Sequence, residues 1–159
     1  MGVTIRPMEE SDRDLVLRGL SETNWQDIPD DQKAVLRRED CDKRVFEDFE
    51  RYLKDEKFRF RVFVAESGSR EPLGYVSVGE LMNPTVGLKF GAVLDFWVEP
   101  RHRNEGIGSR LLDYALEYLK SQRYSHASIM VSAQNELALR MYKKRGFSAD
   151  RINLARKLT

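Results

Sequence analysis

The chain has 159 residues, of which 33% are charged, and its 27 basic and 26 acidic residues leave a formal net charge of +1. A nearly neutral chain has no overall field that draws it to nucleic acid or to an anionic membrane, so we expect neither partner. The single cysteine, Cys41, excludes an intramolecular disulfide and a metal site built from several cysteines, and it is typical of a cytoplasmic protein. Nothing in the composition indicates an oligomeric state.

The length suits one domain over residues 1–159, and no apolar run is long enough to span a membrane or to form a signal peptide. Apolar residues recur at helical spacing in some segments, and β-branched or aromatic runs mark others. The predicted order is strand, helix, helix, three strands, helix, strand, helix and two strands: 3–8, 11–20, 42–54, 58–66, 73–81, 93–98, 108–120, 126–132, 135–145 and a final pair of short strands from Phe147 onward.

Residues 98–109, with the sequence VEPRHRNEGIGS, place a basic turn with two glycines between a strand and the start of a helix. Such a turn directs unpaired backbone N–H groups and the positive end of a helix dipole at one point, so it favours binding of an anion such as a phosphate. A dinucleotide-binding turn needs a third glycine and a later acidic residue, and a nucleotide-triphosphate loop needs Lys-Ser or Lys-Thr. The segment has neither pattern.

These residues resemble the GNAT acetyltransferase superfamily, whose cofactor signature is Q/R-x-x-G-x-G/A directly after its fourth strand. The signature is met by RNEGIG at 103–108. A second block also fits the family, with Asn135, then Tyr142, then Gly146 and Phe147. The resemblance implies an α/β (α+β) fold in which a mixed, mostly antiparallel sheet is flanked by helices and splayed at its central strands.

The resemblance also implies acetyl-CoA as the cosubstrate. Backbone amides from Arg103 to Ser109 would hold the pyrophosphate, and the strand around Trp97 would pair with the pantetheine arm. Asn135 would bind pantetheine or simply begin the following helix as an N-cap. The cofactor-binding residues implied are Phe96, Trp97, Val98, Arg103, Asn104, Glu105, Gly106, Ile107, Gly108, Ser109 and Asn135.

Transfer of acetyl to a primary amine needs an acceptor without its extra proton, an oxyanion donor and an acid for the leaving thiolate. Tyr142 occupies the family's acid position, and the alternative is a core aromatic on the inner face of its helix. The N–H of Val98 would stabilise the oxyanion. Asp95 is the candidate base, with Glu80 and Glu99 as rivals; the alternative for Asp95 is a carboxylate paired with an arginine.

Other chemistries have less support in the sequence. Cys41 lies between Asp40 and Asp42, whose negative charges disfavour a reactive thiolate, so we do not expect a covalent acetyl-cysteine route. The only histidines, His102 and His126, belong to separate segments, and we expect no metal.

Charge is distributed unevenly along the chain. Residues 22–50 hold ten acidic and five basic residues, whereas residues 134–159 hold two acidic and seven basic ones. The acidic part coincides with the segments that grip the acceptor in the GNAT family, so we expect a cationic amine such as a protein N-terminus, a lysine or a polyamine. Two solvated faces of opposite sign are the alternative. A non-catalytic module that senses acyl-CoA or binds a partner would use the same fold.

Overall fold

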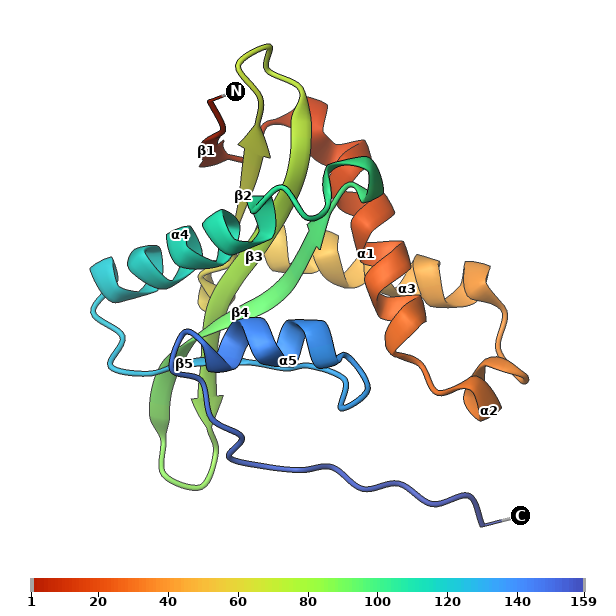
Figure 1. Cartoon of the computed structure of the whole chain (residues 1–159). Helices are drawn as coiled ribbons and strands as arrows, with labels where there is room; N and C mark the ends of the chain where they lie inside the picture. Colours follow the sequence, from red (N-terminus) through yellow and green to blue (C-terminus); the bar gives the residue numbers. More distant parts are fainter. Residues whose placement is uncertain (1, 159) are drawn as a thin grey trace.

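A computed structural model describes residues 2–158 and shows one five-stranded sheet (Figure 1). The strands lie in the order β1-β2-β3-β4-β5, with every neighbouring pair antiparallel except β4 and β5, which are parallel. This arrangement confirms the expected mixed, mostly antiparallel sheet. The strands are β1 (Thr4–Pro7), β2 (Arg61–Glu66), β3 (Pro72–Asn83), β4 (Leu88–Val98) and β5 (Ala127–Ile129).

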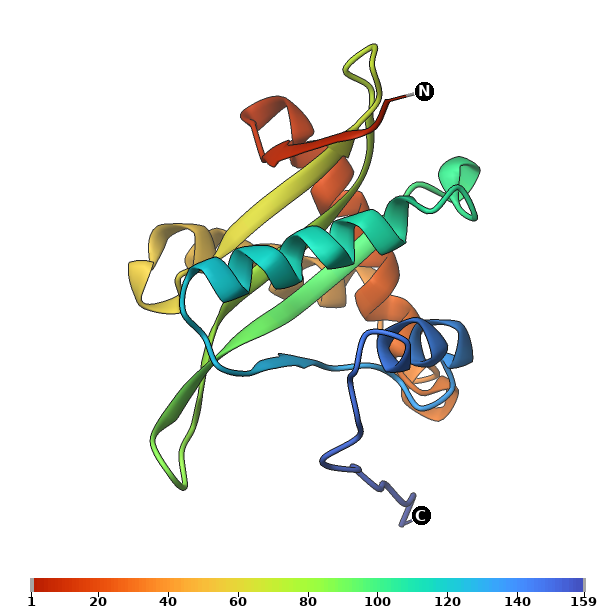
Figure 2. The same ribbon diagram turned by 60° about the vertical axis from the view of Figure 1, so that its left-hand side comes forward.

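Helices cover both faces of the sheet (Figures 1 and 2). Helices α1 and α3 pack on one face, and α4 and α5 lie on the other. The helices are α1 (Arg13–Asp27), α2 (Asp30–Lys33), α3 (Arg38–Lys54), α4 (Ile107–Ser121) and α5 (Glu136–Lys143), with short 3-10 turns at Glu10–Asp12, Glu56–Phe58 and Pro100–His102. Within residues 2–158, no helix combines the length and apolarity needed to cross a membrane.

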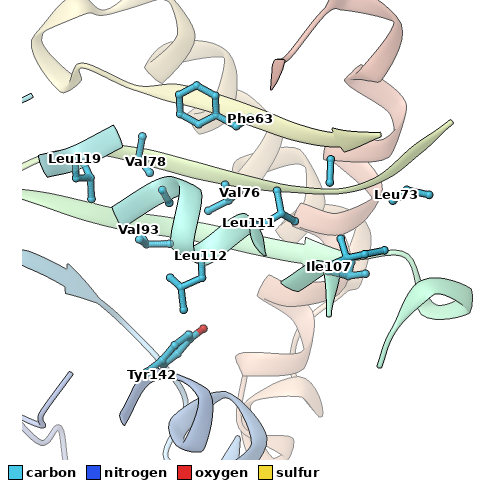
Figure 3. Packing of buried hydrophobic residues seen from close by; sticks show 13 residues of the cluster. Phe63, Leu73, Val76, Val78, Val93, Ile107, Leu111, Leu112, Leu119 and Tyr142 are labelled. Carbon is cyan, nitrogen blue, oxygen red and sulfur yellow. The ribbon is translucent and has the colours of Figure 1, made fainter. Parts of the chain in front are cut away.

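Each face of the sheet carries its own hydrophobic core. On the α4 face, Val76, Val93 and Leu112 belong to a cluster that Figure 3 shows from close by. On the α1 face, Tyr75 and Trp97 pack with apolar residues of α1 and α3. Because buried side chains make the positions of the helices costly to change, the two cores fix α1 and α4 on either side of β4.

Strand β4 changes faces part-way along its length. Ser77 pairs with Asp95 but the next residue, Val78, pairs with Val93, so Leu94 is an extra residue that bulges from the ladder. A bulge shifts the alternation of side chains by one position. Val93 therefore faces the α4 core, whereas Asp95 faces α1.

Strands β4 and β5 separate beyond this bulge. Their pairing covers only Gly91 to Val93 of β4, opposite Ala127 to Ile129 of β5. Residues 94–98 of β4 therefore present an edge that β5 does not cover, which confirms the expected splay.

Several predicted boundaries differ from the structure. Helix α1 continues to Asp27, and β4 begins at Leu88 because the irregular stretch around residues 83–91 contains the turn of the β3–β4 hairpin. The predicted final pair of strands is wrong: residues 148–158 have no regular secondary structure and are exposed throughout. Ile152 and Leu154 are 80% and 88% exposed. A strand needs a neighbour to complete its hydrogen bonds, and this segment leaves the sheet (Figure 1).

Candidate active site

The turn between β4 and α4 presents a row of free backbone donors. The first hydrogen bond of α4 runs from the N–H of Arg110 to the carbonyl of Gly106, at 3.1 Å. The N–H groups of residues 104–109 donate to no other residue in the described range 2–158. Asn104 and Gly106 have positive φ angles of 65° and 78°, which curl the turn so that successive N–H groups converge. Such converging, unpaired donors are a geometry that suits an anion.

The two glycines of the turn have different roles. A Cβ on Gly106 would meet no atom within 4 Å, so the backbone there is open to a ligand. A Cβ on Gly108 would lie 2.9 Å from Cζ of Phe96, so this glycine lets the start of α4 pack against β4. Ile107 is buried in the core below and anchors the helix start.

Charged side chains around the turn are partly engaged with the protein. Arg103 donates from Nε to the carbonyl of Val98 at 3.1 Å, so its guanidinium folds back on β4. The Glu105 carboxylate lies 3.6 Å from Nδ1 of His102. Ser109 is half-buried and its carbonyl accepts from Arg145 at 3.4 Å. The anion-binding capacity of the turn therefore comes chiefly from its backbone.

The end of β4 directs backbone groups toward the open edge. The N–H of Glu99 donates to the carbonyl of Leu73 at 2.9 Å, so these two residues form a hydrogen-bonded pair. Such pairs alternate with non-hydrogen-bonded ones along an antiparallel ladder. The N–H and C=O of Val98, and likewise of Phe96, therefore point away from β3. The side chain of Trp97 packs in the α1 core and donates to Glu22 at 3.3 Å.

The carboxylate of Asp95 lies among hydroxyl groups. Thr23 donates to Oδ1 at 2.9 Å and Tyr75 donates to Oδ2. Burial raises the pKa of Asp95 above its ordinary value. Hydrogen bonds from Tyr75, Thr23 and the backbone N–H of Phe96 oppose that rise, and the charge of Asp27 adds to it. Within residues 2–158 no lysine, arginine or histidine forms an ion pair with this carboxylate. The group is thus a half-buried carboxylate without a cationic partner.

Tyr142 lies at the margin of the α4 core, below Leu112 in Figure 3. It is 7% exposed and its ring meets that of Phe147 edge-on, with centroids 6.0 Å apart. Burial, then the charges of Asp27 and Asp95, raise the pKa of Tyr142 to about 12. The phenol therefore keeps its proton at neutral pH and lies within the field of both carboxylates.

The other residues that the sequence singled out fall into different surroundings. Asn135 caps α5 by accepting from the N–H of Ala138 at 3.2 Å. Glu80 contacts Lys89 at 2.7 Å and accepts from Tyr124 at 2.7 Å. The hydrogen bond from Lys89, and to a lesser degree that from Tyr124, lowers the pKa of Glu80. Glu99 forms an ion pair with Arg18. Of the three candidate bases, Asp95 alone has no cation beside it.

Most acidic residues between 22 and 50 are neutralised by neighbours. Six of them pair with lysine or arginine: Asp30, Asp40, Asp42, Glu47, Asp48 and Glu50. Glu22 instead contacts Trp97, and the charge of Asp27 acts on Asp95 and Tyr142. The acidic character near the open edge therefore comes from Glu22 and Asp27, beside Asp95.

Two surface hollows lie away from Asp95 and Tyr142, and one of them adjoins the turn before α4. One, of about 550 Å³, lies between α1 and α3 over Leu17 and Phe46. The other, of about 520 Å³, adjoins Gly106 and His102. Neither is lined by Asp95 or Tyr142. In the described part of the chain, no three His, Cys, Asp or Glu side chains are grouped so that they could hold a metal ion.

Comparison with known proteins identifies the family of this chain. The family model described as Acetyltransferase (GNAT) family matches residues 23–147, which include the turn, β4 and Tyr142. The chain belongs to the GNAT acetyltransferase family. GNAT proteins use acetyl-CoA, and the free donors of the 104–109 turn and the open edge of β4 suit that polyanionic, peptide-like molecule.

Individual relatives support the assignment of the fold. Mouse N-acetyltransferase 8F1 is 31% identical over 85 residues, which are 54% of this chain but 38% of the mouse protein. A Pyrococcus furiosus protein, provisionally described as an acetyl transferase, has a structure with a TM-score of 0.80 at 24% identity, covering 99% of this chain and 100% of that one. A Clostridium acetobutylicum protein crystallised with acetyl-CoA has a TM-score of 0.72 at 19% identity, covering 99% and 97%.

Two residues at the site, Thr23 and Tyr75, were not identified by sequence reasoning, and Asp27 was identified only as one of the ten acidic residues between 22 and 50. Thr23, Asp27 and Tyr75 reach the neighbourhood of Asp95 from α1 and β3. Thr23 precedes Asp95 by 72 residues and Tyr75 precedes it by 20. No local motif joins these positions, so only the folded arrangement reveals them.

Proposed function

We propose that this protein transfers acetyl from acetyl-CoA to a primary amine, by direct attack of the amine on the thioester. The acceptor is a protein N-terminus, a lysine or a small polyamine-like molecule. The proposal rests on three features that meet at the open edge of β4. They are the uncapped turn at 104–109, the outward backbone of Phe96 and Val98, and the carboxylate of Asp95 near the phenol of Tyr142.

The binding of acetyl-CoA follows from the backbone groups at this edge. The N–H groups of residues 104–109 would hold the pyrophosphate at the start of α4, where the helix dipole favours negative charge. The amide groups of the pantetheine arm would extend the ladder along Phe96 and Val98, as a peptide extends an exposed sheet edge. Side chains of Trp97 and Phe96 turn to opposite faces, and the Arg103 guanidinium, which donates to the Val98 carbonyl, would be displaced from this edge by the pantetheine arm.

The chemistry assigns a role to each group. A lysine-like amine has a pKa of about 10.4 and must lose a proton before it attacks, and Asp95 accepts that proton directly or through water. As the C–N bond forms, charge gathers on the carbonyl oxygen, where the outward N–H of Val98 can donate. Tyr142 gives its proton to the sulfur as the C–S bond breaks, and water restores it.

A cationic acceptor follows from the charges at the edge. Asp95 and Asp27 lie near Tyr142, and Glu22 contacts Trp97. A protonated amine would be attracted by these carboxylates, and its positive charge would compensate the unpaired charge of Asp95. We also place the reaction in the cytoplasm, which suits the single unpaired Cys41.

Two glycines give a matched test of the anion-binding turn. Gly106 and Gly87 have positive φ angles of 78° and 67°, and a Cβ on either would meet no atom within 4 Å. Alanine therefore imposes similar backbone strain at both positions, on the order of 1 kcal/mol. Only Gly106 lies in the turn, so Gly106→Ala should weaken acetyl-CoA binding in calorimetry at least tenfold more than Gly87→Ala does. Equal affinities would contradict the assignment of the turn.

Turnover separates the enzyme from a non-catalytic acyl-CoA sensor on the same fold. Wild-type protein is incubated with acetyl-CoA and a panel of peptides, polyamines, aminoglycosides and amino acids, and released thiol is measured. We expect release that depends on a cationic amine. Tight binding of acetyl-CoA without thiol release over the whole panel would overturn the proposed activity and favour the sensor.

A further inference from the structure

The carboxylate of Asp95 occupies an unusual place for a buried acid. The bulge at Leu94 turns it toward α1, where the neighbouring side chains are Thr23 of α1 and Tyr75 of β3. The charge of Asp27, from α1, acts on it, and its own charge acts on Tyr142 of α5. All are acidic or hydroxyl groups. Because no lysine, arginine or histidine of residues 2–158 pairs with this carboxylate, its charged form depends on the two hydroxyl donors and on the backbone N–H of Phe96.

Tyr75 is a fixed donor to this carboxylate. Its side chain is 0% exposed, and its hydroxyl donates to Asp95 and to no other residue in the described chain. The hydroxyl hydrogen therefore has one acceptor, and the ring is held by packing in the α1 core. A donor to an ionised carboxylate stabilises the charged form. Tyr75 thus holds the orientation of Asp95 and favours its ionised state.

Thr23 differs because its hydroxyl has a choice of acceptors. Its Oγ1 lies 2.9 Å from Oδ1 of Asp95, 3.0 Å from the carbonyl oxygen of Gly19 and 3.4 Å from that of Leu20. A hydroxyl has one hydrogen to donate and lone pairs that accept. Thr23 can therefore donate to an ionised Asp95. Equally, it can accept from a protonated Asp95 while donating to Gly19, and the change needs only rotation of its O–H bond.

The close approach of α1 that makes these contacts depends on Gly19. A Cβ at this position would lie 2.5 Å from Cε1 of Tyr75 and 2.9 Å from Cδ2 of Trp97. Glycine inside a helix costs about 1 kcal/mol relative to alanine. That cost is offset by bringing Thr23, four residues later on the same side of α1, within reach of Asp95.

We propose that Thr23 and Tyr75 are positioning residues for Asp95 during acetyl transfer, with Tyr75 as a permanent donor and Thr23 as a donor that becomes an acceptor when Asp95 gains a proton. The inference rests on the proposed role of Asp95 as the base. In the step concerned, the N–H bond of the acceptor ammonium breaks and an O–H bond forms on Asp95. The Thr23 hydrogen then turns to the Gly19 carbonyl, and loss of the Asp95 proton to water reverses both changes.

Three variants test the two roles. Tyr75→Phe removes a donor to the ionised carboxylate and keeps the ring, so the acid limb of kcat/KM should move to higher pH by about one unit. Thr23→Val keeps the shape but removes both donor and acceptor, and we expect kcat/KM to fall about tenfold or more at its optimum. Thr23→Ser keeps the hydroxyl and should restore the wild-type profile. Thermal melts establish that each variant is folded.

A titration without substrate makes the inference independent of turnover. The side-chain carboxyl carbon of Asp95, followed by NMR against pH, should show a higher pKa in Tyr75→Phe than in the wild type. An unchanged Asp95 titration in folded Tyr75→Phe would overturn the fixed-donor role. If Thr23→Ser were as impaired as Thr23→Val, the rotating-hydroxyl role would be overturned. If Tyr75→Phe does not fold, the two Thr23 variants still decide the inference.

Asp95→Asn distinguishes this inference from the function on which it rests. Wild-type activity in folded Asp95→Asn would mean that Asp95 is not the base, whatever the hydroxyls do. Loss of activity in Asp95→Asn, together with unaltered profiles in Tyr75→Phe and Thr23→Val, would leave the base in place and refute only the positioning roles.

Discussion

Replacing Tyr142 with phenylalanine tests whether its phenol donates the proton that the leaving thiolate needs. The ring is 7% exposed and packs against Phe147, and phenylalanine preserves both contacts. The hydroxyl makes no hydrogen bond to any residue between 2 and 158, so its removal should cost less than about 1 kcal/mol of stability. A change in rate would therefore report chemistry rather than folding.

The size of the rate change follows from the raised pKa. Burial first, then the charges of Asp27 and Asp95, raise the pKa of Tyr142 to about 12, while an ordinary thiol has a pKa of about 8.5. General acids work best when their pKa lies near the operating pH, and their contribution is typically about 10²- to 10⁴-fold. An acid as weak as Tyr142 belongs at the lower end. We expect kcat to fall about 10²-fold, which corresponds to about 2.7 kcal/mol of barrier.

Tyr124→Phe is the matched control. Burial, with the hydrogen bond to Glu80, raises the pKa of Tyr124 to about 12 as well, but this tyrosine precedes β5 and does not face the open edge. Steady-state kcat, measured where chemistry limits the rate, is compared with a thermal melt for both variants. A folded Tyr142→Phe enzyme with wild-type kcat would remove Tyr142 from the mechanism. A large loss in Tyr124→Phe would direct attention to its partner Glu80.

Two further changes test other parts of the structure. Asp27→Asn removes a negative charge that raises the pKa of Asp95 and Tyr142. The acid limb of kcat/KM should therefore move to lower pH, and the KM of a cationic acceptor should rise several-fold. Asp30 pairs with Lys33 and its side chain is 99% exposed, so Asp30→Asn should leave both quantities unchanged in the same assay. Burial disfavours the charged form of Asp12, but hydrogen bonds from Arg6 and the N–H of Glu9 outweigh it and hold the pKa of Asp12 below its usual value. Its contribution to stability should therefore be complete above about pH 4 and lost as pH falls below that value. Asp12→Ala should lower the free energy of unfolding by about 3 kcal/mol at neutral pH, measured by chemical denaturation. A smaller loss than in Asp14→Ala would refute this reasoning.

The sequence predicts the parts of this protein that depend on local chemistry. The turn at 103–108 is visible because glycine and basic residues between a strand and a helix have few other uses. The apolar stripe of α4 is visible because its period is that of a helix, and Leu111, Leu112 and Ala115 are indeed fully buried.

The remaining features depend on contacts between distant segments. The alternation of residues 93–98 gives no sign of the extra residue at Leu94, so the sequence could not show which face Asp95 occupies. The segment after Phe147 contains strand-forming residues, but whether a neighbouring strand is available is a property of the fold. The acidic excess at 22–50 was visible, whereas its neutralisation by Arg37, Arg38 and Arg51 requires the helical spacing of α3.

The bulge at Leu94 has a consequence for how the length of this chain can vary in evolution. Deleting Leu94 itself would only make the ladder regular, because Val93 and Asp95 already face opposite sides. Deleting a residue after it, such as Asp95, would exchange the faces of all that follows in β4, turning Phe96 toward α1 and Trp97 toward α4. No single substitution elsewhere compensates for such an exchange, so insertions and deletions between the bulge and the start of α4 should be eliminated by selection. The exposed hairpin turn between β3 and β4 touches neither core and is free to lengthen or shorten.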